Sequence, residues 1–129
     1  MSYLIDTDWV IDFLLGDATA RNLLTTLPGD LAISIVTYSE VYEGILRSSD
    51  PLRDEQGFRA FLRQARILPI TRAIAKRNAT VRADLRSRGR TVRNRGLDLF
   101  IAATALTYDH TLVTRNMDDC KDISGLKLY

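Results

Sequence analysis

The stretch Tyr3-Leu4-Ile5-Asp6-Thr7-Asp8 combines a short apolar run with a carboxylate at the point where the run ends. An apolar run of this kind predicts a buried strand. The residues that follow, 8–15, predict a short helix that is capped by Asp8 and stopped at Gly16. Because Asp8 already serves as the cap, Asp6 has no evident structural duty. We interpret Asp6 as a functional carboxylate at the end of a strand.

The same alternation of strand and helix continues along the chain. Further strands are expected at 31–36, 67–70, 111–114 and 126–128, and helices at 18–27, 50–66, 71–88 and 97–108, with another helix that begins at a Thr37 cap. Strands separated by helices predict parallel βαβ units, so we expect an α/β protein with a layered α/β/α architecture. Residues 1–129 are expected to form a single domain, since this length suits one hydrophobic core.

The composition is that of an ordinary globular protein. Hydrophobic residues make up 46% of the chain and charged residues 26%, which excludes wholesale disorder. No apolar segment is long enough to span a bilayer and the first residues do not resemble a secretion signal, so we expect a cytoplasmic protein. One cysteine, Cys120, and one histidine, His110, cannot form an internal disulfide or a Cys/His zinc site. Any metal must therefore be bound by oxygen.

The charges are unevenly placed, although the net charge is only +2. Six arginines lie between Arg82 and Arg95, with one acid, Asp84, among them. Such a segment is either a solvated helix end and loop or a phosphate-binding patch, since clustered cations release counterions when they bind nucleic acid. The candidate RNA-binding residues are Arg86, Arg88, Arg90, Arg93 and Arg95.

Acidic residues also follow predicted strands or begin predicted helices at three further places. Glu40 and Glu43 follow the second strand, Asp98 begins an almost wholly apolar helix, and the pair Asp118 and Asp119 follows the fourth strand. Taken singly, each has an ordinary explanation, because acids stabilise the first turn of a helix and favour loops. In an open α/β sheet, however, sites form outside the carboxyl ends of the strands. We therefore expect these acids to meet Asp6 at one edge.

Carboxylates that converge raise one another's pKa unless a cation compensates their charge. Convergence therefore predicts a bound cation, and all-oxygen ligands favour Mg²⁺ or Mn²⁺ over zinc. A divalent ion beside a basic loop indicates phosphate chemistry, in which the metal activates water and neutralises charge on the leaving oxygen.

At these positions the chain resembles the PIN-domain family, and within it the VapC toxins of bacterial and archaeal toxin–antitoxin pairs. The resemblance covers nearly the whole chain and rests on four motifs in order. They are residues 3–8, residues 33–41 with Gly44 after them, residues 98–105, and residues 112–119 with Gly125 and Leu126 after them.

The resemblance implies a central five-stranded parallel sheet and endoribonuclease activity that depends on Mg²⁺ or Mn²⁺. It also implies a homodimer that is inhibited by a cognate VapB antitoxin. The family's catalytic, metal-binding acids fall on Asp6, Glu40, Asp98 and Asp119, with Thr114 and Asn116 as supporting polar groups. The chain departs from the family at Cys120, where an aromatic residue is usual. Asp118 offers a second candidate for the fourth acid, and Glu43 is an additional supporting candidate.

Two other function classes fit parts of the sequence. Residues 6–10 also satisfy the Asp-x-Asp-x-Thr/Val nucleophile motif of haloacid-dehalogenase-type phosphatases, in which Asp8 would be essential. That chemistry also needs a positioned lysine, and neither Lys76, Lys121 nor Lys127 has a suitable place. The third class is a non-catalytic RNA-binding or adaptor domain, for which the arginines suffice and the acids act as caps. Divalent metal binding separates this class from the first two.

The expected helix at 8–15 carries six apolar side chains, too many for one buried face. A short, fully buried helix would explain them. Alternatively, as the resemblance implies, Trp9 or Phe13 lines a groove that receives the antitoxin.

Overall fold

Four parallel strands form the central sheet of the computed structural model, which describes residues 1–129. The strands are β1 (Ser2–Ile5), β2 (Asp30–Ser34), β3 (Ala65–Leu68) and β4 (Thr111–Val113), in the spatial order β3-β2-β1-β4. The helices are α1 (Thr7–Leu14), α2 (Ala18–Thr26), α3 (Ile35–Leu46), α4 (Pro51–Leu62), α5 (Arg72–Ser87), α6 (Gly96–Tyr108) and α7 (Met117–Cys120).

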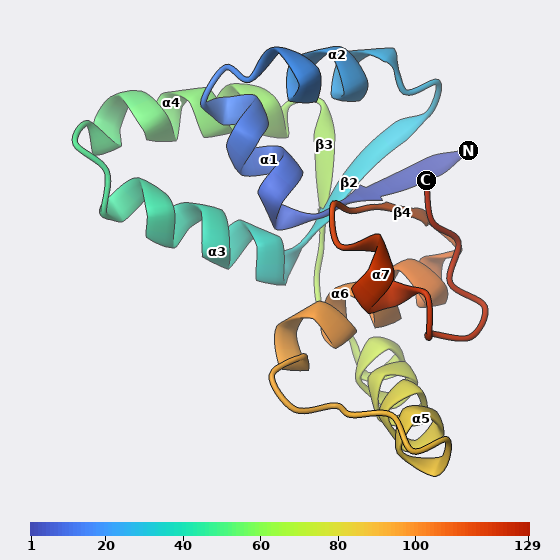
Figure 1. Cartoon of the computed structure of the whole chain (residues 1–129). Helices are drawn as coiled ribbons and strands as arrows, with labels where there is room; N and C mark the ends of the chain where they lie inside the picture. The colour runs from blue at the N-terminus through green and yellow to red at the C-terminus, as the bar shows by residue number, and fades with distance from the viewer.

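The sheet lies between two layers of helices, as the alternation predicts. Helices α1 to α4 gather on one side of it and α5 and α6 on the other (Figure 1). The side chains of β1 alternate between the layers: Tyr3 and Ile5 belong to the core cluster with α1 to α4, whereas Leu4 packs with α6. This alternation is the period of an extended strand buried on both faces. The predicted three-layer α/β/α, PIN-like fold is confirmed.

The fifth strand expected at 126–128 is reduced to one bridge. Leu128 pairs in parallel with Leu112, and the Leu112 amide donates to the Lys127 carbonyl at 2.8 Å. The chain reaches this position through a turn at Gly125, whose φ of +80° suits glycine. With this single bridge in place of a ladder of pairs, the sheet has four strands instead of five.

Two predicted helix caps are wrong. Asp6, with an extended backbone, caps α1 by accepting from the Thr7 amide, and Asp8 lies inside the first turn. Ser34 caps α3, so Ile35 and Val36 belong to the helix and Thr37 is fully buried within it. The cause is the same in both places: strand and helix abut without a loop, and an apolar run does not reveal where one becomes the other.

Smaller differences have local causes. β3 ends at Leu68, one residue before Pro69, because proline has no amide to donate to a sheet. The predicted Thr71 cap of α5 is confirmed, since its hydroxyl accepts from the Ile74 amide at 3.2 Å. The short helix α7, of four residues, was not predicted.

Candidate active site

Asp6 lies where β1 ends, beside the end of β4. Its amide donates to the Val113 carbonyl at 3.0 Å, which extends the pairing of the two strands by one residue. Its carboxylate accepts from the Thr7 amide at 2.7 Å and from the Thr114 hydroxyl, also at 2.7 Å. Burial raises the pKa of Asp6, and these two hydrogen bonds partly oppose the rise. Both oxygens are thus oriented by neighbours, and Thr114 has the supporting position predicted for it.

Glu40 reaches the same edge from α3. Its Oε1 accepts from the Thr7 hydroxyl at 2.6 Å, and the Thr7 and Thr37 hydroxyls are hydrogen-bonded to each other at 3.0 Å. Thr7 and Thr37 are buried, so this short chain of hydroxyls connects the start of α1 to α3 inside the protein. Neither threonine was predicted as a site residue, although the polar Thr7 between two aspartates was a usable signal.

Asp98 completes the convergence from the first turn of α6. Its pKa is raised, first by partial desolvation of the carboxyl and then by the negative charges of Asp6, Glu40, Asp8 and Asp119. Every one of these four charges is a carboxylate, and they come from α1, α3, α7 and the end of β1. These acids, which are distant in the sequence, therefore lie near enough at this edge of the sheet to raise the pKa of Asp98.

The neighbouring aspartates of α7 differ in their surroundings. Asp119 acts on the titration of Asp98, whereas the carboxylate of Asp118 is 93% exposed and pairs with Lys121 at 3.2 Å. Asn116 precedes α7 without a side-chain cap, and its amide donates to the Thr114 hydroxyl at 3.0 Å. Of the two candidates for the fourth acid, the geometry favours Asp119.

Glu43 lies outside this cluster. Its side chain is 71% exposed and forms an ion pair with Arg47 at 3.8 Å on the surface of α3. Positions 40 and 43 lie only about 60° apart around the helix, but the Glu43 side chain pairs with Arg47 at the surface instead of reaching Thr7 as Glu40 does. Glu43 is therefore not brought together with the other predicted site residues.

Cys120 is buried next to the acids. Burial, followed by the negative charges of Asp6 and Asp98, raises the pKa of its thiol to about 11. The group thus stays a neutral thiol near pH 7 and packs with Leu4, Ile101 and Leu112. This leaves oxygen as the donor type of the site, as expected from the cysteine and histidine counts.

The acid cluster fits a divalent cation in charge and in donor type. Carboxylates without a cation among them raise one another's pKa, and the neighbouring acids add in this way to the effect of desolvation on the pKa of Asp98. A bound Mg²⁺ or Mn²⁺ would relieve that repulsion. No three Asp, Glu, His or Cys side chains already stand close enough together to hold one ion. The candidate ligands are Asp6, Glu40, Asp98 and Asp119.

A cavity of about 620 Å³ opens from the acids toward the arginine-rich segment. Asp98, Asp118 and Asp119 line one part of it, and Arg90, Arg93 and Arg95 line another.

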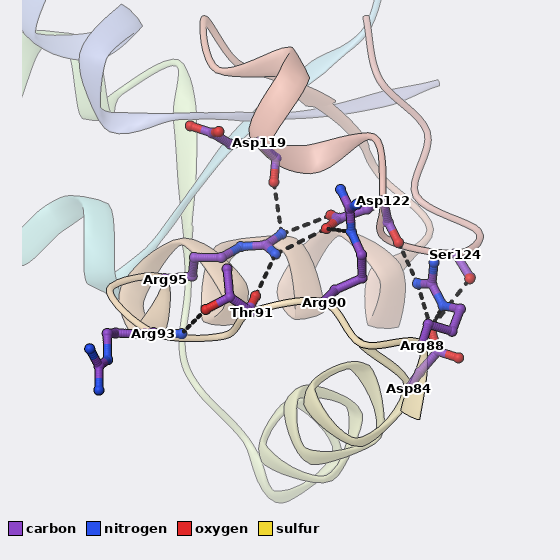
Figure 2. A network of polar contacts seen from close by, with 9 residues as sticks. All are labelled: Asp84, Arg88, Arg90, Thr91, Arg93, Arg95, Asp119, Asp122 and Ser124. Carbon is purple, nitrogen blue, oxygen red and sulfur yellow. Dashed lines mark hydrogen bonds and ion pairs between the residues drawn. The ribbon is translucent and has the colours of Figure 1, made fainter. Parts of the chain in front are cut away.

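Three of the five predicted RNA-binding arginines have ion-pair partners: Arg88 binds Asp84 at 2.8 Å, and Arg90 and Arg95 bind Asp122 at 3.2 and 2.8 Å. Arg86 and Arg93 are exposed and form no ion pair. Figure 2 shows this network.

A second, largely apolar groove of about 320 Å³ lies between α1, α3 and α4. Its lining includes Ile11, Leu14 and Leu15 from α1, Val41 and Ile45 from α3, and Gly57 from α4. Trp9 and Phe13 do not line it. Arg115 covers the ring of Trp9 at 3.7 Å from the ring centroid, and Phe13 packs against Phe61.

Comparison with known proteins adds three findings. The family model described as PIN domain matches residues 3–125. The chain is 25% identical over 130 residues to Ribonuclease VapC1 of Haemophilus influenzae strain R2866, covering 98% of this chain and 96% of that protein.

Solved structures with the same fold come from toxin–antitoxin pairs. One is VapBC2 from Rickettsia felis bound to a DNA fragment from its promoter, with a TM-score of 0.88, 25% identity, and coverage of 100% of this chain and 98% of that one. Another is a toxin–antitoxin complex from Klebsiella pneumoniae, with a TM-score of 0.77, 31% identity, and coverage of 96% and 94%.

Proposed function

The chain belongs to the PIN-domain family, and from this premise we propose that it is a VapC-type ribonuclease, the toxin of a toxin–antitoxin pair. The observation that carries the proposal is the gathering of Asp6, Glu40, Asp98 and Asp119 from four elements at the carboxyl edge of the sheet. A cavity lined by arginines beside these acids suits a polyanionic substrate.

In the proposed hydrolysis the four acids have different surroundings and therefore different roles. Asp6 and Glu40 are held by the Thr114, Thr7 and Thr37 hydroxyls, so their oxygens keep their orientation without reorganising during the reaction. Asp98 and Asp119 contribute carboxylates from the opposite side, next to the cavity in which RNA would lie. Mg²⁺ or Mn²⁺, when bound, would supply an activated water and neutralise charge on the phosphate.

The rival functions are not favoured. A haloacid-dehalogenase-type phosphatase needs a positioned lysine, but Lys121 pairs with Asp118 and Lys127 with Asp109 on the surface. In an adaptor domain the acids would serve as helix caps, and Asp6 does cap α1. Capping does not explain why four other carboxylates lie near Asp98 and raise its pKa.

We expect the purified protein to cleave single-stranded RNA only when Mg²⁺ or Mn²⁺ is present. EDTA should abolish cleavage and added Mn²⁺ should restore it, because the oxygen donors repel one another without a cation. The measurement is cleavage of an end-labelled oligoribonucleotide, with Mn²⁺ binding followed in parallel by calorimetry. Full cleavage in EDTA, or no Mn²⁺ uptake together with no cleavage, would contradict the proposal.

The fourth acid can be identified with a matched pair of variants. Asp119→Asn should weaken Mn²⁺ binding by at least about 10-fold, since even groups that only orient metal ligands are worth about 10- to 100-fold. Asp118→Asn removes the same charge one residue away, from an exposed carboxylate paired with Lys121, and should leave the Mn²⁺ affinity unchanged. Calorimetric titration measures both, and the reverse order of effects would assign the role to Asp118.

We further propose that a VapB-type antitoxin occupies the apolar groove between α1, α3 and α4. An amphipathic helix would bury its apolar face against Ile11, Leu14 and Val41. Trp9 and Phe13 remain predicted contacts of the antitoxin outside this groove. The homodimer and the cytoplasmic location also remain predictions. None of the helices has the length and apolar character needed to cross a membrane.

A further inference from the structure

The arginines between residues 86 and 95 form two groups that their spacing in the sequence does not distinguish. The side chain of Arg95 is 16% exposed, and that of its partner Asp122 is 10% exposed. Its guanidinium donates to both Asp122 oxygens at 2.8 and 3.0 Å. It also donates to two main-chain carbonyls, that of Thr91 at 2.9 Å and that of Asp119 at 2.8 Å. The guanidinium of Arg95 is therefore already bound by protein oxygens, and the Asp122 carboxylate is its closest counter-charge.

The carbonyl of Asp119 is an important partner because α7 has few other restraints. This four-residue helix has no side-chain cap at its start. Its apolar side is held by Cys120, which is buried, and the carbonyl of Asp119 is held by Arg95. Figure 2 shows the Arg95 guanidinium between Asp119 and Asp122. A rigid bidentate fork of this kind fixes the main chain that carries the Asp119 carboxylate.

Arg93 has the opposite surroundings. Its side chain is exposed and forms no ion pair, and only its amide is held, by the Thr91 hydroxyl at 3.2 Å. In Figure 2 its side chain projects away from the network. Three arginines line the cavity next to the acids. Arg90 and Arg95 form ion pairs with Asp122, and Arg93 has no ion-pair partner.

We propose that these arginines have divided roles: Arg95 is a positioning residue that holds Asp119 through its main chain, and Arg93 contacts a phosphate of the RNA. This inference rests on the proposed ribonuclease function and assigns its substrate contact. Of the five arginines predicted to bind RNA, it assigns the phosphate contact at the cavity to Arg93 and a positioning role to Arg95.

The salt dependence of RNA binding separates the two roles. Each phosphate contact to single-stranded nucleic acid contributes about 0.7 to the slope of log K against log salt concentration. Arg93→Gln should reduce the slope by about 0.7, whereas Arg95→Gln should leave the slope unchanged because Asp122 already neutralises Arg95. Binding of a labelled oligoribonucleotide is measured by fluorescence anisotropy in EDTA over a range of KCl concentrations.

Kinetics and metal binding supply the second readout. Arg95→Gln should lower kcat with little change in KM, and should weaken Mn²⁺ binding by about 10- to 100-fold, as for other groups that orient a metal ligand. Arg93→Gln should raise KM and leave the Mn²⁺ affinity unchanged. Arg95→Lys should rescue little, since an ammonium group cannot bridge both Asp122 oxygens and two carbonyls.

Asp122→Asn keeps the proposal testable if Arg95→Gln does not fold. It retains the shape of the partner, loses its charge, and should lower kcat in the same way as Arg95→Gln. Equal reductions of the salt slope in the Arg93 and Arg95 variants, with unchanged kcat in Arg95→Gln, would overturn the division of roles. A wild-type protein that neither binds Mn²⁺ nor cuts RNA would instead overturn the proposed function.

Discussion

Asp98→Asn is expected to lower RNA cleavage by about 1,000-fold or more, which corresponds to about 4 kcal/mol in the activation barrier. Four other carboxylates lie near enough to Asp98 to raise its pKa, and the neutral amide would remove both a proposed metal ligand and the charge that attracts the ion. Asp98 is exposed and forms no hydrogen bond with its side chain, so the substitution should not disturb the fold. Initial rates on a labelled oligoribonucleotide measure the effect.

Asp6→Asn should produce a loss of similar size for the same reason. Asparagine also caps helices well, and its Oδ1 can accept from the Thr7 amide as Asp6 does, so α1 should still form. The control is Glu43→Gln, which removes an exposed charge from the surface of α3, outside the acid cluster. A lost surface charge is worth less than about 1 kcal/mol, so that variant should keep its rate within about fivefold. Cleavage at the wild-type rate by both Asp6→Asn and Asp98→Asn would rule out this site.

Gly57→Phe is expected to weaken antitoxin binding by about 30-fold or more, or about 2 kcal/mol, the scale of a lost binding hot spot. Gly57 lines the apolar groove, and a Cβ added there meets no atom of the protein within 4 Å. A phenylalanine at this open position is expected to place its ring in the space of the partner helix. The ligand is a VapB-type antitoxin, co-expressed with the protein and purified, and its affinity is measured by calorimetry.

The matched control at the same position is Gly57→Ala. Alanine is too small to fill the groove, and it should stabilise α4 by about 0.5–1 kcal/mol because glycine disfavours helix interiors. Both variants should cut RNA at the wild-type rate, since the groove does not include the acids. A Gly57→Phe protein that binds the antitoxin as tightly as Gly57→Ala would mean that the antitoxin docks elsewhere.

The sequence predicted the acids of the site better than the groups that hold them. Asp6 and Asp98 could be found because a carboxylate directly after a buried strand, or leading a buried helix, stands out locally. Thr7 could not be assigned its role, because the partner that gives it one, Glu40, lies 33 residues away. A hydrogen bond of this kind depends on tertiary packing, and the hydrophobic periodicity of a sequence does not indicate which distant side chains will meet.

The partners of the arginine-rich segment could not be predicted from the sequence either. The local run of positive charge is visible, but its neutralisation by Asp122 comes from a residue 27 positions after Arg95. The last strand was overestimated for a related reason. Leu126 and Leu128, which alternate with Lys127, predict an extended segment, yet the number of pairs that it forms depends on the tertiary structure.

The hydrogen bond between Asp6 and Thr114 joins groups 108 residues apart in the chain. A ribosome making this protein has produced Asp6, Glu40 and Asp98 well before it adds β4 and α7. The acid site therefore cannot assemble in the nascent chain until β4 has been made and has paired with β1.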